Sequence, residues 1–579
     1  VRRVANLSFY LAIKCGLSEQ EAVMLRVSSP MHDIGKIGIN DAILLKPGKL
    51  DDQEFEEMKK HAQLGHDILK NSKREILKNA SIIAFQHHEK FDGSGYPTGL
   101  VGEDIHIFGR ISAIADVFDA LTHKRCYKEL GLSEDILMEH AARSILEYIQ
   151  SKFVSNEKVL IVCGAGNNGA DGIALARLLY GKYDVSLYLP YGSKSHMSKL
   201  QHKRTQLLGI EIIEDLSTLG INHTPNIIVD CLFGSGLSRD LDSESQNLIK
   251  LLNSLYAHKI ACDIPSGINT QGQITTTCFR ANTTITMGAL KTQLYTDMAK
   301  DHVGNILVSN LGIQRVHYET QSNIYLLDEL DMIVPYRTIQ NSHKGKYGHL
   351  GVIVGEKIGA GIIACEAAFS FGAGLVTAVS HETLNIPLHI MQNHTIPINC
   401  TALAIGMGLG RYESKEIQKL LDTDIAKVID ADLFYDDIVL TILNKENIVL
   451  TPHPKEFCSL LKLCDICDIS VDELQNNRLK YLRLFAELFP QSVLLLKGAN
   501  SLMTYENMIY INTLGTVALS KGGSGDVLSG LIASLLAQGY NGINACITAS
   551  LAHSISASKY AKNNYALTPH DLIEGVKLL

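Results

Sequence analysis

The chain has 579 residues, a net charge of −8 at neutral pH, 46% hydrophobic residues and 20% charged residues. These values are typical of a globular protein of roughly three or four domains, and the acidic balance excludes nucleic acid as a main partner. No apolar run is long enough to cross a bilayer and the twelve cysteines show no framework spacing, so we expect a cytoplasmic protein without membrane attachment. Because the first residue is Val1 rather than Met, we also expect a fragment or a trimmed chain.

Hydrophobic patterns divide the chain into three segments. Residues 1–122 show helical patterns and few strand patterns, which predicts an all-α domain. Residues 123–320 and residues 325–579 alternate strand and helix patterns, which predicts an α/β lobe in each. No low-complexity linker separates the segments, so we expect tight joins near Thr122 and near Asp328.

The first segment carries imidazole and carboxylate side chains that suit iron or manganese better than structural zinc. The candidate ligands are His32, Asp33, His61, His87, His88 and Asp116. Because adjacent residues on a helix point about 100° apart, we expect that His87 and His88 do not easily share one ion, and a pair of metals is the natural arrangement. Two metals clamp the attacking and leaving oxygens in phosphodiester hydrolysis.

The motifs around these ligands, 31–37, 87–97 and 115–121, resemble those of the HD-GYP phosphodiesterases. The resemblance implies hydrolysis of cyclic di-GMP, with Lys36 near the scissile phosphate. That family has a further ligand in a helix that would precede Val1, and more helix after the last motif. We therefore expect an HD-GYP-type domain that is truncated at both ends, present either as a functional fusion or as an artefact of the reading frame.

The second segment opens its α/β pattern with a strand, a glycine loop and a helix. The strand is predicted at 158–162, the loop at 164–171 and the helix from about Gly172. The loop contains the pattern GxGxxG, which an NAD-binding fold complements with an acid at the end of the second strand. That strand is predicted at 185–190 and ends without an acid, so we do not expect a dehydrogenase.

Two further loops, 231–240 and 263–267, follow buried strands of the same segment. Ligands of open parallel sheets bind beyond the carboxyl ends of the strands, where such loops meet. Three hard oxygen donors there suit an alkali or alkaline-earth cation, namely Asn168, Asp230 and Ser266. Asp263 can exchange a proton with a substrate.

The loops at 167–171, 234–240 and 263–267 resemble those of the NAD(P)H-hydrate epimerases, a Rossmann-like α/β family, within a match from about Lys124 to Ile313. The resemblance implies that Asp263 is catalytic and that the three oxygen donors bind potassium. It assigns substrate binding to Asn167, Asn168, Gly169, Ala170, Asp171, Gly234, Ser235, Gly236, Leu237, Ser238, Arg239, Asp240 and Asp263. Ala170 stands where the family has glycine, and we expect it to be tolerated if its φ is negative.

The third segment contains glycines and an acid directly before an apolar helix pattern, at 521–528. Such a helix start is an anion site. We expect Asp526 to take a proton from a substrate hydroxyl while the N–H groups of Gly522–Gly525 stabilise developing phosphate charge. Lys497 follows a buried strand and is interpreted as a phosphate or nucleotide contact, and His453 lies on a stiff loop between two prolines.

This set resembles the ADP-dependent NAD(P)H-hydrate dehydratases, a ribokinase-like α/β family, over about 325–579. The resemblance implies that Ala360, Gly408, His453 and Asp526 contact the hydrated nucleotide. It assigns the adenylate part of ADP to Lys497, Gly498, Ala499, Asn500, Ser501 and Gly525. The implied reaction phosphorylates the ring hydroxyl and then eliminates phosphate, with Mg²⁺ expected from the general logic of phosphoryl transfer.

Taken together, the segments predict a bifunctional repair enzyme for hydrated NADH and NADPH that uses ADP, Mg²⁺ and K⁺ and forms a homo-oligomer. Two other function classes stay open at this point. One is a ribokinase-like small-molecule kinase, since these kinases share a glycine-rich loop that ends in Asp. The other is a cyclic di-GMP signalling phosphodiesterase with a nucleotide-sensing C-terminal region. A non-catalytic binding role for the second segment is also open.

Overall fold

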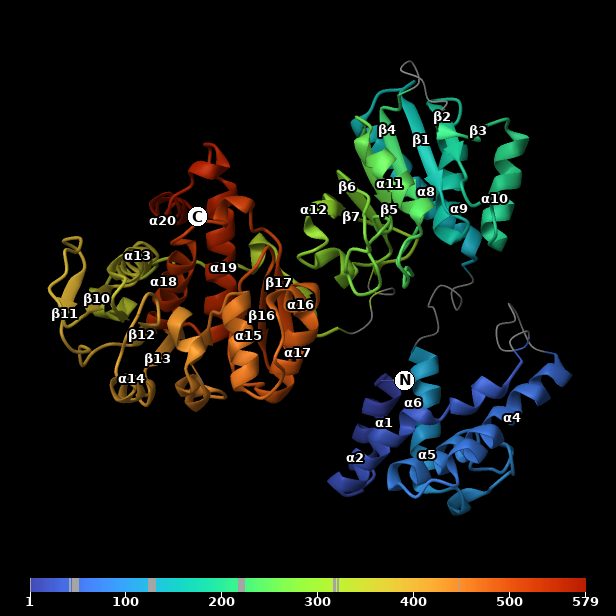
Figure 1. Cartoon of the computed structure of the whole chain (residues 1–579), viewed down its shortest axis with the longest axis horizontal. Coiled ribbons are helices and arrows are strands. Elements are labelled where there is room, and N and C mark those ends of the chain that lie inside the picture. The colour runs from blue at the N-terminus through green and yellow to red at the C-terminus, as the bar shows by residue number, and fades with distance from the viewer. Residues whose placement is uncertain are drawn as a thin grey trace. The chain divides into compact units, whose positions relative to one another are not determined.

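The structure is a computed structural model and describes residues 2–40, 43, 51–122, 132–216, 224–315, 319, 322–445 and 447–579 (Figure 1). It forms two compact units, Val1–Ser133 and Glu134–Leu579. The predicted join near Thr122 leads into residues 123–131, which lie outside the described residues. Among the residues described, we find no helix with the length and hydropathy of a membrane span.

The first unit is helical, as predicted. Its elements are α1 (Arg2–Lys14), α2 (Glu19–Ser28), η1 (Ser29–Met31), η2 (Ile34–Gly38), α4 (Asp52–Leu69), α5 (Glu75–Gln86), η3 (Gly102–Asp104) and α6 (Ile107–Thr122). Capping boxes at Ser18 and Asp51 start α2 and α4. A Cβ at Gly35 would lie 1.9 Å from the His61 carbonyl oxygen, so this glycine lets η2 approach α4 closely and brings Asp33 toward His61.

The second unit begins with a parallel sheet of seven strands in the order β3-β2-β1-β4-β5-β6-β7. The strands are β1 (Lys158–Cys163), β2 (Asp184–Tyr188), β3 (Glu211–Ile213), β4 (Ile227–Cys231), β5 (His258–Cys262), β6 (Thr283–Met287) and β7 (Asn305–Ser309). The helices of this lobe are α8 (Glu134–Lys152), α9 (Asn167–Leu179), α10 (His196–Leu207), α11 (Ser243–Ser254), η6 (Thr292–Tyr295) and α12 (Lys300–Val303). The order reverses between β1 and β4, which is the doubly wound arrangement expected of a Rossmann-like lobe.

The helix that follows β1 starts earlier than predicted. We expected a loop up to Asp171, but α9 begins at Asn167, so 167–171 form its first turn. A Cβ at Gly169 would lie 1.8 Å from the Gly164 carbonyl oxygen, and only glycine lets the helix start this close to the strand end. Ala170 is buried in a helical conformation, which agrees with the expectation that its methyl group is tolerated.

The rest of the second unit is a ten-stranded sheet in the order β11-β10-β9-β12-β13-β14-β15-β16-β17-β8. Its strands are β8 (Ile324–Leu326), β9 (His349–Ile353), β10 (Leu375–Val379), β11 (Met391–Asn393), β12 (Ala402–Ile405), β13 (Ala426–Ile429), β14 (Ile448–Leu450), β15 (Val493–Leu496), β16 (Ser501–Tyr505) and β17 (Met508–Asn512). Seven neighbouring strands, from β11 to β15, pair in parallel, and β16 turns antiparallel to β15. Strand β15 ends directly before Lys497, which confirms the buried strand predicted there.

Eight α-helices in the described part of this lobe flank the sheet, and α18 lies among them with nearly every side chain buried. They are α13 (Ile358–Ser370), α14 (Ser414–Leu421), α15 (Pro454–Leu463), α16 (Val471–Asn476), α17 (Arg478–Leu488), α18 (Ser524–Ala537), α19 (Gly542–Ser558) and α20 (Pro569–Val576). Because α18 packs against α13 and α19, its amino end is held rigidly beside the carboxyl ends of the parallel strands. That end carries the glycine-rich stretch predicted as an anion site.

Candidate active sites

Asp263 follows β5 directly, at the carboxyl edge of the first sheet. Its Oδ1 atom accepts hydrogen bonds from Lys291 Nζ at 2.6 Å and from Met287 N at 3.1 Å, and Oδ2 accepts one from Ser235 N at 3.4 Å. Its φ of 70° lies in the left-handed region, which costs on the order of 1–3 kcal/mol for such a residue. The surrounding contacts therefore hold this carboxylate in a strained, fixed position, as is common at active sites.

Two carboxyl groups at this edge are driven toward opposite protonation states. Burial acts to raise the pKa of Asp263, but Lys291 and the hydrogen bonds outweigh it, and the pKa of Asp263 lies below its ordinary value. Burial and the nearby charge of Asp263 raise the pKa of Asp171 well above its ordinary value. At neutral pH, Asp263 is thus a carboxylate that can accept a proton, while burial beside that charge favours the protonated form of Asp171.

A cavity of about 800 Å³ opens at these strand ends. Its lining includes the predicted substrate residues Asn167, Asn168, Asp171, Gly234, Ser235, Gly236, Leu237, Ser238, Arg239 and Asp263. Gly169 and Ala170 are instead buried within α9, and Asp240 is exposed outside the lining. The structure therefore gathers most of the predicted set around one cavity. Lys291 was not predicted, because no local sequence pattern marks it.

Of the three predicted potassium ligands, Asp230 and Ser266 are in direct contact. Ser266 donates to Asp230 from its hydroxyl at 2.7 Å and from its backbone N at 2.8 Å, and Leu232 N donates at 3.1 Å. These donors are neutral, and burial raises the pKa of Asp230 to about 6. Asn168 lies beside Gly234, and its amide nitrogen is buried without a hydrogen-bond partner. A buried carboxyl group with only neutral donors is chemically suited to a nearby cation.

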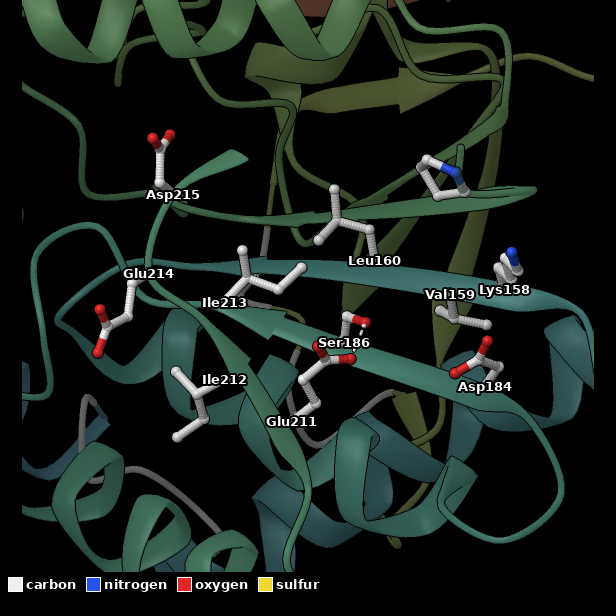
Figure 2. Close-up of a pocket in the computed structure, with 11 residues that line it drawn as sticks. Lys158, Val159, Leu160, Asp184, Ser186, Glu211, Ile212, Ile213, Glu214 and Asp215 are labelled. Carbon is white, nitrogen blue, oxygen red and sulfur yellow. Dashed lines mark hydrogen bonds between the residues drawn. The ribbon is translucent and has the colours of Figure 1, made fainter. Parts of the chain in front are cut away.

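A second hollow, of about 590 Å³, lies along β3 and the first residues of β1 and β2 (Figure 2). Carboxylates dominate its polar lining, and Ser186 Oγ donates to Glu211 at 3.1 Å within it. None of the predicted site residues lines this hollow. It adjoins the chain on both sides of residues 217–223, which are outside the described part, and we assign it no function.

Asp526 lies in the first turn of α18, as predicted. Gly523 caps this helix with a φ of 86°, which the glycine tolerates and other residues rarely adopt. Burial and the charge of Asp430 raise the pKa of Asp526 to about 6, against an opposing effect of Lys497 and Lys357. A carboxylate with this pKa is mostly ionised at neutral pH and is still basic enough to accept a proton from a substrate.

Lys497 is paired with an aspartate that sequence analysis missed. Its Nζ atom lies 2.6 Å from Asp430 Oδ1, and Ser529 Oγ of α18 donates to Asp430 Oδ2 at 2.6 Å. A Cβ at Gly525 would lie 3.5 Å from Lys497 Nζ, so the ammonium group faces the start of α18. Asp430 follows β13 directly, and an acid at the end of a buried strand is the signal that would have identified it.

His453 is less free than its position between prolines suggested. It caps α15, where its Nδ1 atom accepts from Lys455 N and Glu456 N at 3.1 and 3.2 Å. Its ring is half-exposed, with Nε2 3.0 Å from Glu456 Oε1. Lys497 N donates to Pro452 O at 3.0 Å, which places this loop beside Lys497. Because Lys497 also acts on the pKa of Asp526, His453, Lys497 and Asp526 belong to one region.

Ala360 and Gly408, predicted to contact the hydrated nucleotide, lie together. A Cβ at Gly408 would come within 3.2 Å of the Ala360 Cβ, and the φ of Gly408 is 60°. Lys357 N donates to Gly408 O at 2.9 Å. Because the charge of Lys357 also lowers the pKa of Asp526, this pair of small residues borders the same site.

In the first unit, four predicted ligands converge: the ligand atoms of Asp33, His61, His87 and His88 all lie within 4.8 Å of one another. The Nε2 atoms of His61 and His88 are 3.1 Å apart, and the buried Nε2 of His87 has no hydrogen-bond partner. Burial lowers the pKa of His87 to about 3 and that of His88 to about 4. These imidazoles are therefore neutral at pH 7 and available as ligands, which fits a metal ion.

The expectation that His87 and His88 do not easily share one ion assumed that both residues lie within a helix. This premise is wrong, because α5 ends at Gln86 and His87 is its C-cap, and both residues belong to the group of four converging ligands. The chain leaves the helix there, so the 100° offset no longer separates the two rings.

The other two predicted ligands form a second group beside the first. His32 Nε2 lies 3.4 Å from Asp116 Oδ1 and 3.5 Å from Asp33 Oδ2. Asp33 therefore faces both groups, with Oδ1 toward His61 and Oδ2 toward His32. Lys36 Nζ, expected near the scissile phosphate, lies 2.6 Å from Asp33 Oδ2. The pair of metals stays a prediction, and Asp33 lies between the two groups of ligands.

Three protein-family models match the chain. They are the YjeF-related protein N-terminus over 134–293, the NAD(P)H-hydrate dehydratase over 350–577 and the HD domain over 1–145. The chain is 43% identical to the bifunctional NAD(P)H-hydrate repair enzyme Nnr of Helicobacter pylori over 79% of this chain and 97% of that protein. The chain belongs to the family of bifunctional NAD(P)H-hydrate repair enzymes. The enzyme Nnr of Dictyoglomus turgidum is 33% identical over 78% of this chain and 95% of its own length.

The first unit has relatives of its own. It is 54% identical to a 3′3′-cGAMP-specific phosphodiesterase of Vibrio cholerae over 143 residues, which are 25% of this chain and 27% of that protein. The match covers only about a quarter of this relative, so the activity of the whole relative is not carried over to this chain.

Proposed function

We propose that this chain repairs hydrated NADH and NADPH in two steps, epimerisation of the R and S forms and ADP-dependent dehydration of the S form. The observation that carries the proposal is the pairing, in one compact unit, of the Asp263 cavity with the Asp526 site, each within a segment that matches one of the two family models. Fusion of the two activities is useful because a dehydratase alone would leave one epimer unrepaired.

In the epimerase lobe, Asp263 accepts a proton from the substrate and Asp171 supplies one. The opposite shifts of their pKa values support these roles, since one group must be charged and the other neutral. Lys291 is the positioning residue that keeps Asp263 ionised. Asn168, Asp230 and Ser266 are the proposed holders of K⁺, which would supply positive charge beside the substrate's phosphates.

In the dehydratase lobe, Asp526 takes the proton of the ring hydroxyl as that oxygen attacks the terminal phosphate of ADP, which releases AMP. The backbone N–H groups at the start of α18 stabilise the charge on the transferred phosphoryl group. Elimination of phosphate from the ring then restores NADH or NADPH. Mg²⁺ supplies charge neutralisation at the phosphates when it is bound.

The proposal is tested with purified hydrated NADH, a mixture of both epimers, and ADP or ATP. We expect the near-ultraviolet absorbance of NADH to return in full, with one AMP or ADP released for each NADH formed. No return with either nucleotide would refute the dehydratase assignment. Accumulation of a stable phosphorylated product would instead favour the small-molecule kinase.

The rate of dehydration should depend on pH in a way set by Asp526. Its pKa is raised from the ordinary 3.8 to about 6, so below pH 6 most of the enzyme carries a protonated, inactive base. We expect kcat/KM for the S form to fall about tenfold per pH unit below that point and to be flat from pH 7 to 8. A profile that stays flat down to pH 5 would contradict the role of Asp526 as the base.

We also propose that the first unit is a metal-dependent cyclic dinucleotide phosphodiesterase of HD-GYP type, with iron or manganese and cyclic di-GMP as substrate. The cluster of Asp33, His61, His87 and His88 favours it, together with the match to an HD domain. The predicted homo-oligomer also stays a prediction, which light scattering on the full chain would check.

The metal site is tested by elemental analysis of the full chain. We expect iron or manganese in the wild-type protein, loss of that metal in His61→Ala, and no change in His106→Ala, which replaces an exposed histidine of the same unit. Hydrolysis of cyclic di-GMP should follow the metal content. Metal without hydrolysis would limit the first unit to metal binding, and equal metal in all three proteins would contradict the site.

A further inference from the structure

The loop predicted to bind the adenylate part of ADP is held by a side chain of the other lobe. Asp297 lies between η6 and α12 of the epimerase lobe. Its Oδ2 atom accepts from Ala499 N at 2.9 Å, and its Oδ1 atom accepts from Asn500 N at 3.2 Å. One carboxylate thus fixes two consecutive N–H groups of the loop 497–501.

Arg478, at the start of α17, holds the same loop from the dehydratase side. It is 5% exposed and forms an ion pair with Asp297. Its guanidinium donates at 2.9–3.0 Å to three carbonyl oxygens, those of Leu496, Lys497 and Asn500. A Cβ at Gly498 would lie 2.3 Å from Arg478 Nη1, so the loop can wrap the guanidinium only because this residue is glycine.

Two further contacts come from the epimerase lobe. Lys300 Nζ on α12 donates to Gly515 O at 2.8 Å, to Thr513 O at 3.2 Å and to Ala499 O. The Tyr295 carbonyl oxygen accepts from the buried Asn500 Nδ2 at 2.9 Å. Residues 295–300 of the epimerase lobe therefore contact both the loop 497–501 and residues 513–515, which follow β17.

We propose that the epimerase lobe completes the nucleotide site of the dehydratase lobe, with Asp297 and Lys300 as positioning residues for the loop 497–501. This inference rests on the proposed function, in which that loop binds ADP. We call the contacts of Asp297 and Lys300 with this loop and with residues 513–515 the clamp. Because the clamp orders the loop before ADP binds, binding does not have to supply the free energy of ordering it, so the clamp acts on ADP affinity. The proton transfer at Asp526 takes place on α18, which the clamp does not touch.

The test compares Asp297→Asn with Asp301→Asn in the full chain. Asp301 is an exposed acid on α12, so its replacement makes the same change in charge outside the clamp. We expect Asp297→Asn to raise the Kd for ADP by calorimetry, and the KM for ADP, by roughly tenfold, because hydrogen bonds to a charged group are lost. The value of kcat at saturating ADP and the epimerase rate should stay at wild-type values, as should every parameter of Asp301→Asn.

Two more variants distinguish the loss of these contacts from a folding defect. Asp297→Asn leaves the buried Arg478 without its charged partner, so loss of the epimerase rate would mark misfolding. In that case Lys300→Gln, which removes only the second set of contacts, decides the matter and should raise the KM for ADP several-fold. Asp297→Glu restores the charge and should recover part of the affinity.

The outcomes separate this inference from the function on which it rests. If the wild-type chain neither binds ADP nor restores NADH, the proposed function fails and this inference falls with it. If the wild-type chain binds ADP and both Asp297→Asn and Lys300→Gln bind it equally well, the function stands and the clamp is refuted. A fall in kcat with an unchanged KM for ADP would also refute it.

Discussion

The Asp526→Asn protein is expected to lose the ADP-dependent return of NADH by roughly 10²- to 10⁴-fold, the range for removal of a general base. An amide of the same size cannot accept the proton of the ring hydroxyl. The loss should appear in kcat, because the N–H groups at the start of α18 still bind phosphate. Initial rates with the purified S form at pH 7.5, with ADP in excess, would measure it.

The fold of this variant should not suffer. Because the native pKa of Asp526 is above its ordinary value, its ionisation destabilises the native state, and the stability present at low pH is lost as the pH rises from 3.8 through about 6. The uncharged amide of the variant relieves this above pH 6, so we expect an equal or higher Tm at pH 8. Asp472→Asn, an exposed acid on α16, is the matched control and should retain full activity. If the Asp526→Asn protein dehydrates the S form at the wild-type rate, this carboxylate is not the general base.

The Asp263→Asn protein is expected to lose exchange between the R and S epimers by a similar factor, because the proton acceptor is gone. Dehydration of the purified S form should continue at the wild-type rate. With a mixture of epimers, the return of NADH should therefore stop once the S form is exhausted. Chiral separation of the remaining substrate would measure the exchange directly.

This substitution also removes the negative charge that pairs with the half-buried Lys291, which keeps its hydrogen bonds to Thr286 Oγ1 and Met287 O, so we expect a loss of stability on the order of 1 kcal/mol. The dehydratase rate of the same protein serves as the internal check that the chain is folded. Asp184→Asn, in the hollow of Figure 2, replaces an exposed acid of the same lobe and should exchange epimers normally. Normal exchange by Asp263→Asn would leave the second lobe with a binding role only.

Local sequence patterns were sufficient to predict most of the strands and helix starts that carry the candidate sites. The apolar runs at 158–162 and directly before Lys497 predicted buried strands, and β1 and β15 confirm them. The position of Asp526 in the first turn of α18 also followed from the pattern, because glycines and an acid before an apolar helix are a local signal.

The contacts that tune these residues could not be predicted in this way. Lys291 follows β6 and contacts Asp263, which follows β5. Asp430 follows β13 and contacts Lys497, which follows β15. These partners are 28 and 67 residues apart in the sequence, so no local pattern predicts the contacts. The start of α9 was placed too late for another reason. It depends on how closely the backbone of Gly169 approaches the Gly164 carbonyl oxygen, and the glycine pattern alone does not specify that turn geometry.

By itself, the sequence determined where the acids, glycines and histidines stand relative to strand and helix ends, because these are properties of neighbouring residues. Only the tertiary structure decided which side chains meet and with what charge. Burial and distant partners set the pKa of Asp526 and Asp263, and the end of α5 brought His87 and His88 together. Electrostatic and metal-ligand interactions act through space over a few ångströms, and the order of residues along a chain does not record those distances.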